Sequence, residues 1–99
     1  MRVFIKDVGG SKIQAWVEDW DHKQNEWETV SQANCIVMGK KCMVDTIDTP
    51  PKYRKKGYAT AIVRELQKYF SEVAPIGVTA SGRRFWDKLG MKDALGEEV

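Results

Sequence analysis

The sequence is short of the residues on which several protein classes depend. It has two cysteines and one histidine among 99 residues, too few to complete a tetrahedral zinc site. No apolar run approaches the roughly 20 residues that a membrane span needs, and the first residues lack the apolar stretch of a signal peptide. With only three prolines and 42% hydrophobic residues, the composition is typical of a folded globular chain. We therefore expect one compact domain over residues 1–99, in the cytoplasm, with no metal and no membrane partner.

The net charge is also small, +2 from 16 basic and 14 acidic residues, but it is unevenly distributed. Residues 1–49 carry 6 basic and 8 acidic side chains, whereas residues 50–99 carry 10 and 6, so the second half is suited to face an anion. Nucleic-acid phosphates are one such anion, but the nearby aromatic residues have helical core spacing and do not form a stacking platform. We therefore expect that nucleic acid is not the partner of the basic residues Arg54, Lys55, Lys56, Arg83 and Arg84.

The first half has the patterns of β-strands separated by short turns. Ile13 to Val17 alternates apolar and polar residues, the period of a strand with one buried face. Turn residues stand between the apolar runs, and Pro50-Pro51 ends the last of them. Four strands with short connections predict an antiparallel meander. The predicted strands lie at residues 3–5, 13–17, 27–38 and 42–48.

The second half changes to helical periodicity. From Tyr58 to Phe70 the apolar residues fall on one helical face. Residues 73–79 are predicted to form a short strand, and a final helix begins with a cap at Ser81 and ends at Gly90. The order β-β-β-β-α-β-α predicts an α+β fold with a mostly antiparallel central sheet. The apolar face of the first helix comprises Ala59, Ile62, Val63, Leu66, Tyr69 and Phe70.

A basic loop joins the fourth strand to the first helix, from Pro51 to Thr60. Helix N-termini expose unpaired N–H groups and the positive end of the helix dipole, which together favour phosphate. Gly57 lets a ligand approach the main chain, because glycine has no Cβ. The loop therefore predicts a binding site for a phosphate or pyrophosphate.

The residues Arg54-x-x-Gly57-x-Ala59 resemble motif A of the GNAT superfamily of acetyl-CoA-dependent N-acetyltransferases. That motif is Gln/Arg-x-x-Gly-x-Gly/Ala between a strand and a long helix. The segment from Phe85 to Met91 is similar to the superfamily's Phe-Tyr-x-Lys-x-Gly-Phe signature on its last helix. The two matches stand in the expected order and span residues 42–92, about half of the chain. The resemblance implies the three-layer α/β GNAT fold.

The resemblance also implies roles for individual residues. Acetyl-CoA would be the cosubstrate, with its pyrophosphate held by main-chain N–H groups between Arg54 and Ala59. The strand at residues 46–49 would pair with the pantetheine arm and diverge from the strand at residues 76–79, leaving a gap for the thioester. A neutral amine would then attack the thioester carbonyl. The implied cofactor-binding residues are Ile47, Asp48, Thr49, Arg54, Lys55, Lys56, Gly57, Tyr58, Ala59, Thr60, Phe85 and Lys88.

Three features depart from the superfamily pattern. Only Gly9-Gly10-Ser11 separates the first two apolar runs, so the two helices that usually help to form the acceptor site are missing. Trp86 stands where many members have a tyrosine that protonates the leaving thiolate. Either Tyr53, Tyr58 or water takes that role, or the thiolate leaves without assistance. Only nine residues follow Gly90, too few for the usual closing hairpin.

The general base has two candidates, Asp45 and Asp48. Strand alternation places Asp45 on the side of Met43 and Ile47, and Asp48 stands next to the predicted gap. Trp16 and Trp20 share a strand face that those missing helices would cover. They could pack there, form the acceptor wall, or make a homodimer interface through the uncovered sheet face. The acidic residues Glu18, Asp19, Asp21, Glu26 and Glu28 either attract a cationic amine or form a solvated edge.

The sequence favours an N-acetyltransferase that transfers acetyl from acetyl-CoA to an amine by direct attack in a ternary complex. The amine would be a protein lysine or N-terminus, or a small amine. The alternative is a non-catalytic regulatory module that binds acetyl-CoA or CoA.

Overall fold

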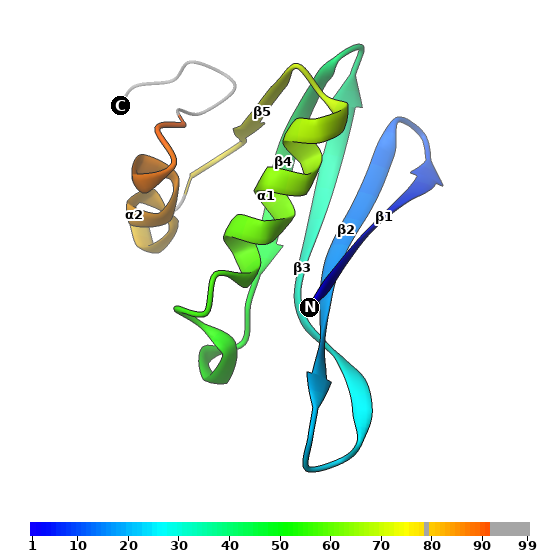
Figure 1. The fold of residues 1–99 in the computed structure, drawn as a ribbon. Helices are drawn as coiled ribbons and strands as arrows, with labels where there is room; N and C mark the ends of the chain where they lie inside the picture. Colours follow the sequence, from blue (N-terminus) through cyan, green and yellow to red (C-terminus); the bar gives the residue numbers. More distant parts are fainter. Residues whose placement is uncertain (79, 92–99) are drawn as a thin grey trace.

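The computed structural model describes residues 1–78 and 80–91, and in them one five-stranded sheet with the order β1-β2-β3-β4-β5 (Figure 1). The first four strands are antiparallel, and β5 runs parallel to β4. This arrangement confirms the predicted meander and α+β class. The strands are β1 (Arg2–Gly9), β2 (Lys12–Asp21), β3 (Glu26–Met38), β4 (Lys41–Asp48) and β5 (Glu72–Pro75).

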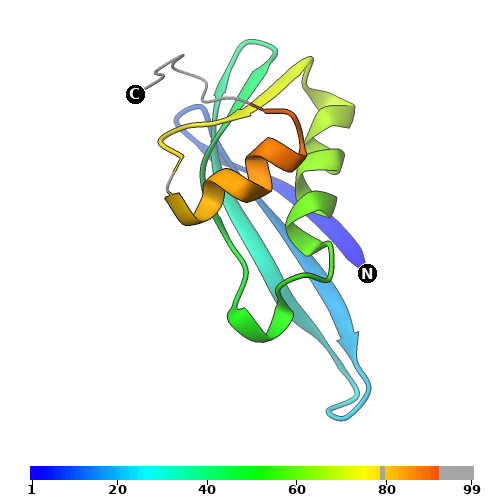
Figure 2. The same ribbon diagram turned by 90° about the vertical axis from the view of Figure 1, so that its left-hand side faces the viewer.

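Among residues 1–78 and 80–91, three helical elements accompany the sheet: the 3₁₀ turn η1 (Pro51–Tyr53), α1 (Tyr58–Tyr69) and α2 (Ala80–Lys88). Helix α1 makes the crossover between the parallel strands β4 and β5, and it lies against one face of the sheet (Figure 2). Helix α2 lies on the β5 side of the sheet (Figures 1 and 2). None of the helices in the described ranges is long and apolar enough to cross a membrane.

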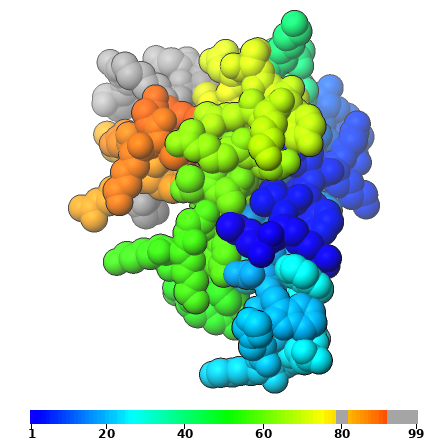
Figure 3. Space-filling model, in the orientation of Figure 1, coloured from blue at the N-terminus to red at the C-terminus, as the bar shows by residue number. Residues whose placement is uncertain are grey.

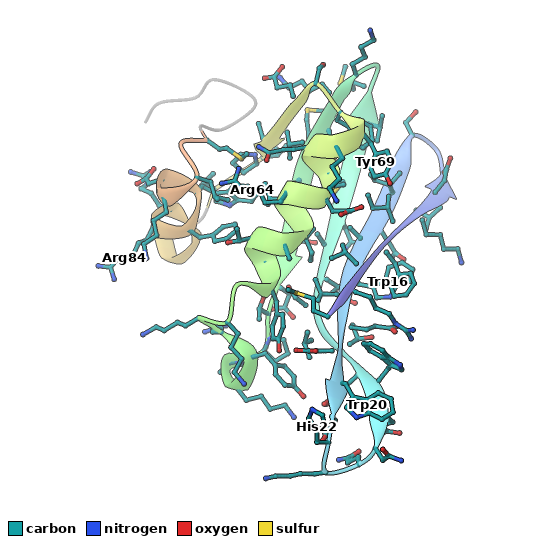
Figure 4. The ribbon with its side chains drawn as sticks, in the orientation of Figure 1. Trp16, Trp20, His22, Arg64, Tyr69 and Arg84 are labelled. Atoms are coloured by element: carbon teal, nitrogen blue, oxygen red, sulfur yellow. The ribbon has the colours of Figure 1, made fainter. Side chains whose placement is uncertain are left out.

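The hydrophobic core lies between α1 and the sheet. Alternate residues of β2 point toward α1, and Ala15 and Val17 have no exposed surface. From the helix, Ile62, Val63 and Leu66 are equally buried, at the positions that helical spacing predicts. Tyr69 departs from the prediction, because its side chain is 69% exposed at the end of α1 (Figure 4).

The opposite sheet face, here called the outer face, carries an aromatic and polar surface. Phe4 of β1 stacks on Trp16 of β2, with ring centroids 5.4 Å apart. The Arg2 guanidinium lies 3.9 Å from the centroid of the Trp27 ring and bonds Glu18 at 2.7 Å. The β1–β2 connection is a turn at residues 10–11, which confirms that no helix separates these strands.

Strands β2 and β3 extend beyond the rest of the sheet as a projecting hairpin, here called the arm, residues 18–29 (Figures 1 and 3). Trp20 and Trp27 pair across it and pack edge to face, with ring centroids 5.6 Å apart. Asp21 accepts main-chain hydrogen bonds from Lys23 and Gln24, which fixes the turn at its tip. His22 lies at this tip, exposed, as the polar run around it predicts (Figure 4).

Two predicted boundaries are wrong. Strand β5 ends at Pro75 rather than extending to residue 79: the Ile76 N–H still bonds the Val44 carbonyl at 2.9 Å, but Gly77 then adopts a φ of 64° and turns the chain. Helix α2 begins at Ala80, so Ser81 lies inside it and does not precede it as a cap. Residue 79, the Ser81 side chain and the chain after residue 91 lie outside the described parts.

The C-terminus of α2 agrees with the sequence. The Met91 N–H bonds the Trp86 carbonyl and the Gly90 N–H bonds the Asp87 carbonyl, the paired bonds of a Schellman motif. Gly90 has a φ of 68°, the left-handed conformation that this motif requires.

Cys35 and Cys42 are free thiols, both buried, on the neighbouring strands β3 and β4. Contact with Cys42, together with burial, raises the pKa of the Cys35 thiol. Cys35 is therefore a neutral core side chain.

Candidate functional site

The basic loop meets α1 in the geometry of an anion-binding site. Gly57 occupies the N-cap position of α1 with a φ of 82°, and within the described part of the chain no side chain bonds the first N–H groups of α1. The first turn also lacks an acidic residue, so the positive end of the helix dipole is not neutralised locally. A Cβ placed on Gly57 would meet nothing within 4 Å, which shows that the space above this glycine is open.

Lys55 has a φ of 64°, a left-handed conformation uncommon for a residue with a side chain. Gly57 is left-handed as well, and left-handed residues are components of the main-chain nests that bind anions. Lys55 and Lys56 are exposed and add positive charge to the site. Arg54 has a different role, because its Nε donates to the Thr49 carbonyl at 2.9 Å and closes the loop on itself.

Two tyrosines flank this loop. Tyr53 precedes it at the end of η1, and Tyr58 follows it as the first residue of α1, with ring centroids 6.4 Å apart at 73°. The Tyr58 hydroxyl donates to Asp19 Oδ2 at 2.5 Å, which raises the pKa of Tyr58 to about 12 and lowers that of Asp19. The hydroxyl is therefore bound and weakly acidic, and Tyr58 is unsuited to protonate a leaving thiolate.

Strands β4 and β5 part beside the loop. Their last strand pair is Val44 with Pro75, while β4 continues to Asp48. In this last part of β4, no described strand pairs with β4 on the β5 side. The gap agrees with the strand divergence that the GNAT resemblance implies. Thr49 fixes the end of β4, because its hydroxyl lies 2.7 Å from the buried Ser31 hydroxyl.

The predicted placement of Asp45 is wrong, because Asp45 is a β-bulge. Asn34 pairs with Thr46 and the next residue of β3 pairs with Val44, so Asp45 is an extra residue without a partner opposite. The bulge reverses the alternation that follows. Met43 lies on the outer face, whereas Ile47 lies on the α1 side, so Asp45 cannot share a side with both.

Asp48 lies on the outer face at the end of β4, where it pairs with Gln32. Both aspartates are exposed, and neither has a side-chain hydrogen bond or an ion pair to any described residue. Ile47 is half-buried and packs against the core, opposite Ala33. Of the predicted site residues on β4, Ile47 therefore belongs to the core. Asp45 and Asp48, three positions apart, carry solvated carboxylates.

The α2 residues singled out from the sequence differ in environment. Trp86 is 5% exposed and belongs to the core, with Phe85 packed edge to face at 4.9 Å. Lys88 is exposed and lines a shallow hollow with Arg83, Arg84 and Asp87. The Arg84 side chain points away from the body of the molecule (Figure 4). Helix α2 therefore presents a basic surface, while its aromatic residues hold it on the core.

Sequence reasoning missed the connection between the arm and the loop. Asp19 was considered only as part of an acidic cluster, yet it bonds the first residue of α1. Glu28 lies opposite Asp19 and contacts Lys52 of η1, with its carboxylate 3.9 Å from the ammonium nitrogen. The register set by the turn at Asp21–Asn25 is the signal that would have placed these two acids side by side.

Comparison with solved structures identifies the fold. An aminoglycoside N-acetyltransferase in complex with CoA superposes with a TM-score of 0.65 at 12% identity, over 92% of this chain and 74% of that one. A ribosomal-protein-alanine N-acetyltransferase from Brucella melitensis biovar Abortus 2308 gives 0.65 at 15% identity, over 90% and 70%. A Trypanosoma brucei acetyltransferase gives 0.62 at 15% identity, over 90% and 68%. No protein-family model and no curated protein sequence matches the chain.

The chain therefore has the fold of the GNAT N-acetyltransferases, as its two sequence motifs imply. At these identities the likeness establishes the fold alone, because one fold can carry many activities.

Proposed function

We propose that this protein is an acetyl-CoA-dependent N-acetyltransferase. The observation that carries the proposal is the uncapped N-terminus of α1, set in a basic loop directly beside the gap between β4 and β5. Solved proteins with this fold include N-acetyltransferases, one of them in complex with CoA.

The loop fits the pyrophosphate of acetyl-CoA in shape and charge. The unbonded N–H groups at Tyr58, Ala59 and Thr60 are the donors that a phosphate oxygen accepts from a helix N-terminus. Open space above Gly57 admits the ligand to the main chain. Lys55 and Lys56 supply positive charge, and the Thr60 hydroxyl is a further donor in the first turn of α1. Phe85 and Lys88 would complete the cofactor contacts from α2.

The gap between the strands fits the pantetheine arm and the thioester. An extended chain with amide groups can bond the last residues of β4 as a neighbouring strand would. Residues 47–49 would make these main-chain contacts. The thioester would then lie between β4 and β5, next to the carboxylates of Asp45 and Asp48.

The chemistry needs little from the protein beyond positioning. The nitrogen of a neutral amine attacks the thioester carbonyl carbon, the C–N bond forms, and the C–S bond breaks with the electron pair leaving on sulfur. Holding the two reactants together supplies much of the acceleration, because effective molarities can reach about 10⁵ M. Asp48 or Asp45 would accept the proton that the amine loses. Thiolate is a stable leaving group near neutral pH, since thiols have a pKa near 8.5.

The acceptor would approach from the outer face, where both helices that usually form its site are missing. We infer that it carries an amine, on a protein or on a small molecule. A second copy of the chain across the outer face would cover Phe4 and Trp16 and enclose the acceptor. Sedimentation at increasing protein concentration tests this homodimer, which a stable monomer would exclude.

Calorimetric titration with acetyl-CoA tests the proposal, using wild type, Gly57→Glu and Gly39→Glu. Gly39 is a matched control: it also has a positive φ, 60°, and a Cβ there would also meet nothing within 4 Å. Both variants therefore introduce the same strain and the same charge, but only Gly57→Glu places them in the loop. We expect micromolar binding for wild type and Gly39→Glu, and none for Gly57→Glu. Absence of binding by wild type would refute the proposal.

Turnover separates the enzyme from a CoA-binding regulatory module. We expect release of CoA in the presence of an amine panel, and a large loss of that activity in Asp48→Asn with acetyl-CoA binding retained. A wild-type protein that binds acetyl-CoA but acetylates no amine in the panel would indicate the regulatory module.

A further inference from the structure

Two carboxylates face each other on the arm in a way that ordinary strand pairing does not favour. Asp19 of β2 and Glu28 of β3 are direct cross-strand partners on the α1 side of the sheet. Like charges directly opposite each other destabilise an antiparallel pair. Both side chains are only partly exposed, 35% for Asp19 and 36% for Glu28, and each carboxylate also contacts a group outside this strand pair.

A β-bulge places Glu28 on this side. Val17 pairs with Ser31 and Glu18 pairs with Thr29, so Val30 is an extra residue in β3. If alternation ran unbroken through residue 30, counting from the buried Ser31 would put Glu28 on the outer face. The bulge therefore brings Glu28 to the same face as Asp19, toward η1 and the start of α1.

Each carboxylate then holds one end of the basic loop. Asp19 accepts the hydrogen bond of Tyr58, the residue directly after the loop. At the other end, Glu28 contacts Lys52 of η1 at 3.9 Å, and the neighbouring Glu28 carboxylate raises the pKa of the Tyr53 hydroxyl. The two tyrosine rings touch edge to face between these contacts. The loop from residue 54 to residue 57 thus starts and ends at side chains that are fixed to one rung of the arm.

We propose that Asp19 and Glu28 are positioning residues for the basic loop, and that through Tyr58 and Tyr53 they set its affinity for CoA. The inference rests on the proposed function, because it takes CoA as the ligand of the loop. It assigns the projecting arm a role in cofactor binding.

A simple charge effect and a positioning role of Asp19 predict opposite changes in CoA affinity. A carboxylate near a phosphate site opposes anion binding, and its removal should strengthen that binding if charge were the only effect. If the hydrogen bond to Tyr58 positions the donors at the start of α1, Asp19→Asn should instead weaken CoA binding. Tyr58→Phe, which changes no charge, should weaken it as well.

The experiment measures the dissociation constant of CoA by calorimetry for wild type, Asp19→Asn, Tyr58→Phe and the double variant. We expect each single variant to bind about tenfold more weakly, as loss of one hydrogen bond to a charged group would produce. The double variant should bind no more weakly than either single variant, because both remove the same interaction. Glu18→Gln is the control: Glu18 is the adjacent acid on the arm, but it bonds Arg2 on the outer face. It should bind CoA as wild type does or slightly more tightly.

A second measurement distinguishes a positioning role from general loss of structure. Labelled tyrosine in nuclear magnetic resonance should titrate at about 12 for Tyr58 in wild type, and nearer the ordinary pKa of 10.0 in Asp19→Asn. The melting temperatures of the variants show whether the fold is retained. Glu28→Gln should weaken CoA binding in the same way, without changing the titration of Tyr58.

Three results would overturn the inference. Tighter CoA binding by Asp19→Asn would show that charge alone matters, and unchanged binding by both single variants would show that the loop does not depend on the arm. Additive losses in the double variant would mean that Asp19 and Tyr58 act separately. Absence of CoA binding by wild type is a different result from these three. It would refute the proposed function, and the role of Asp19 and Glu28 in CoA binding would be refuted with it.

Discussion

The conformation of Gly57 allows stability and ligand binding to be separated in one substitution, Gly57→Ala. Because a Cβ at this position meets no atom within 4 Å, the methyl group should clash with nothing in the protein. Its effect on folding is then limited to the left-handed backbone, at a φ of 82°. The same methyl group would occupy the space through which a pyrophosphate reaches the main chain.

The magnitudes follow from the backbone. A residue with a Cβ is disfavoured in the left-handed region by about 1–2 kcal/mol. Alanine also reduces the entropy of the unfolded chain, which offsets about 0.4–1 kcal/mol of that loss. The net destabilisation should be about 1 kcal/mol, a fall in melting temperature of about 4–8 °C for a chain of this size. Acetyl-CoA binding should weaken by at least about tenfold, which is about 1.4 kcal/mol of binding free energy.

Thermal unfolding and calorimetric titration of the same protein samples measure the two effects, with Gly39→Ala as the control. Gly39→Ala should lose similar stability, because its backbone is similarly strained, and should bind acetyl-CoA normally. Equal acetyl-CoA affinity for Gly57→Ala and Gly39→Ala would refute the assignment of the loop. A stability loss of several kcal/mol in Gly57→Ala would show that the space above this glycine is not open.

Three further predictions concern the core, the end of β4 and the pH range. Leu66→Ala should lower the free energy of unfolding by about 2–5 kcal/mol, because Leu66 is fully buried. Tyr69→Ala, at an exposed position, should change it little, and urea titration compares the two variants. Ser31→Ala removes the hydrogen bond between the buried Ser31 hydroxyl, 2% exposed, and Thr49, and should lower the free energy of unfolding by about 1–3 kcal/mol. A smaller change in urea titration would mean that this bond does not fix the end of β4. The Tyr58 pKa is raised in the folded state from 10.0 to about 12, so its stabilisation is complete below pH 10 and is lost as the pH rises through about 12. Unfolding measured across this range should fall more steeply in wild type than in Tyr58→Phe, and parallel curves would contradict the assignment.

Hydrophobic periodicity was sufficient to predict the sheet and the first helix. Helix α1 was predicted at residues 58–70 and ends at Tyr69, and each of the four antiparallel strands overlaps its predicted run. These elements have long patterns in which burial and propensity agree. The basic loop was also predicted correctly as a loop before a helix, because Pro50-Pro51 and Gly57 interrupt those patterns on either side.

The features that shape the candidate site were harder to predict. The bulges at Val30 and Asp45 each add one residue without a signal in the alternation, and each changes which face the following residues occupy. That is why Asp45 was assigned the wrong neighbours. The contact between Asp19 and Tyr58 spans 39 positions, so no local pattern contains it. Roles for the site residues stay predictions until binding is measured.

The uncapped start of α1 also means that this helix is incomplete by itself. An anion seated there would act as the missing cap, and any species that binds only the folded state shifts the folding equilibrium by mass action. At a hundredfold excess over its dissociation constant, such a ligand adds about 2.7 kcal/mol, a large share of the stability of a small domain. Phosphate buffers would then make the protein more heat-resistant than chloride buffers do. The stability of this chain would thus depend on the anions dissolved around it as well as on its own residues.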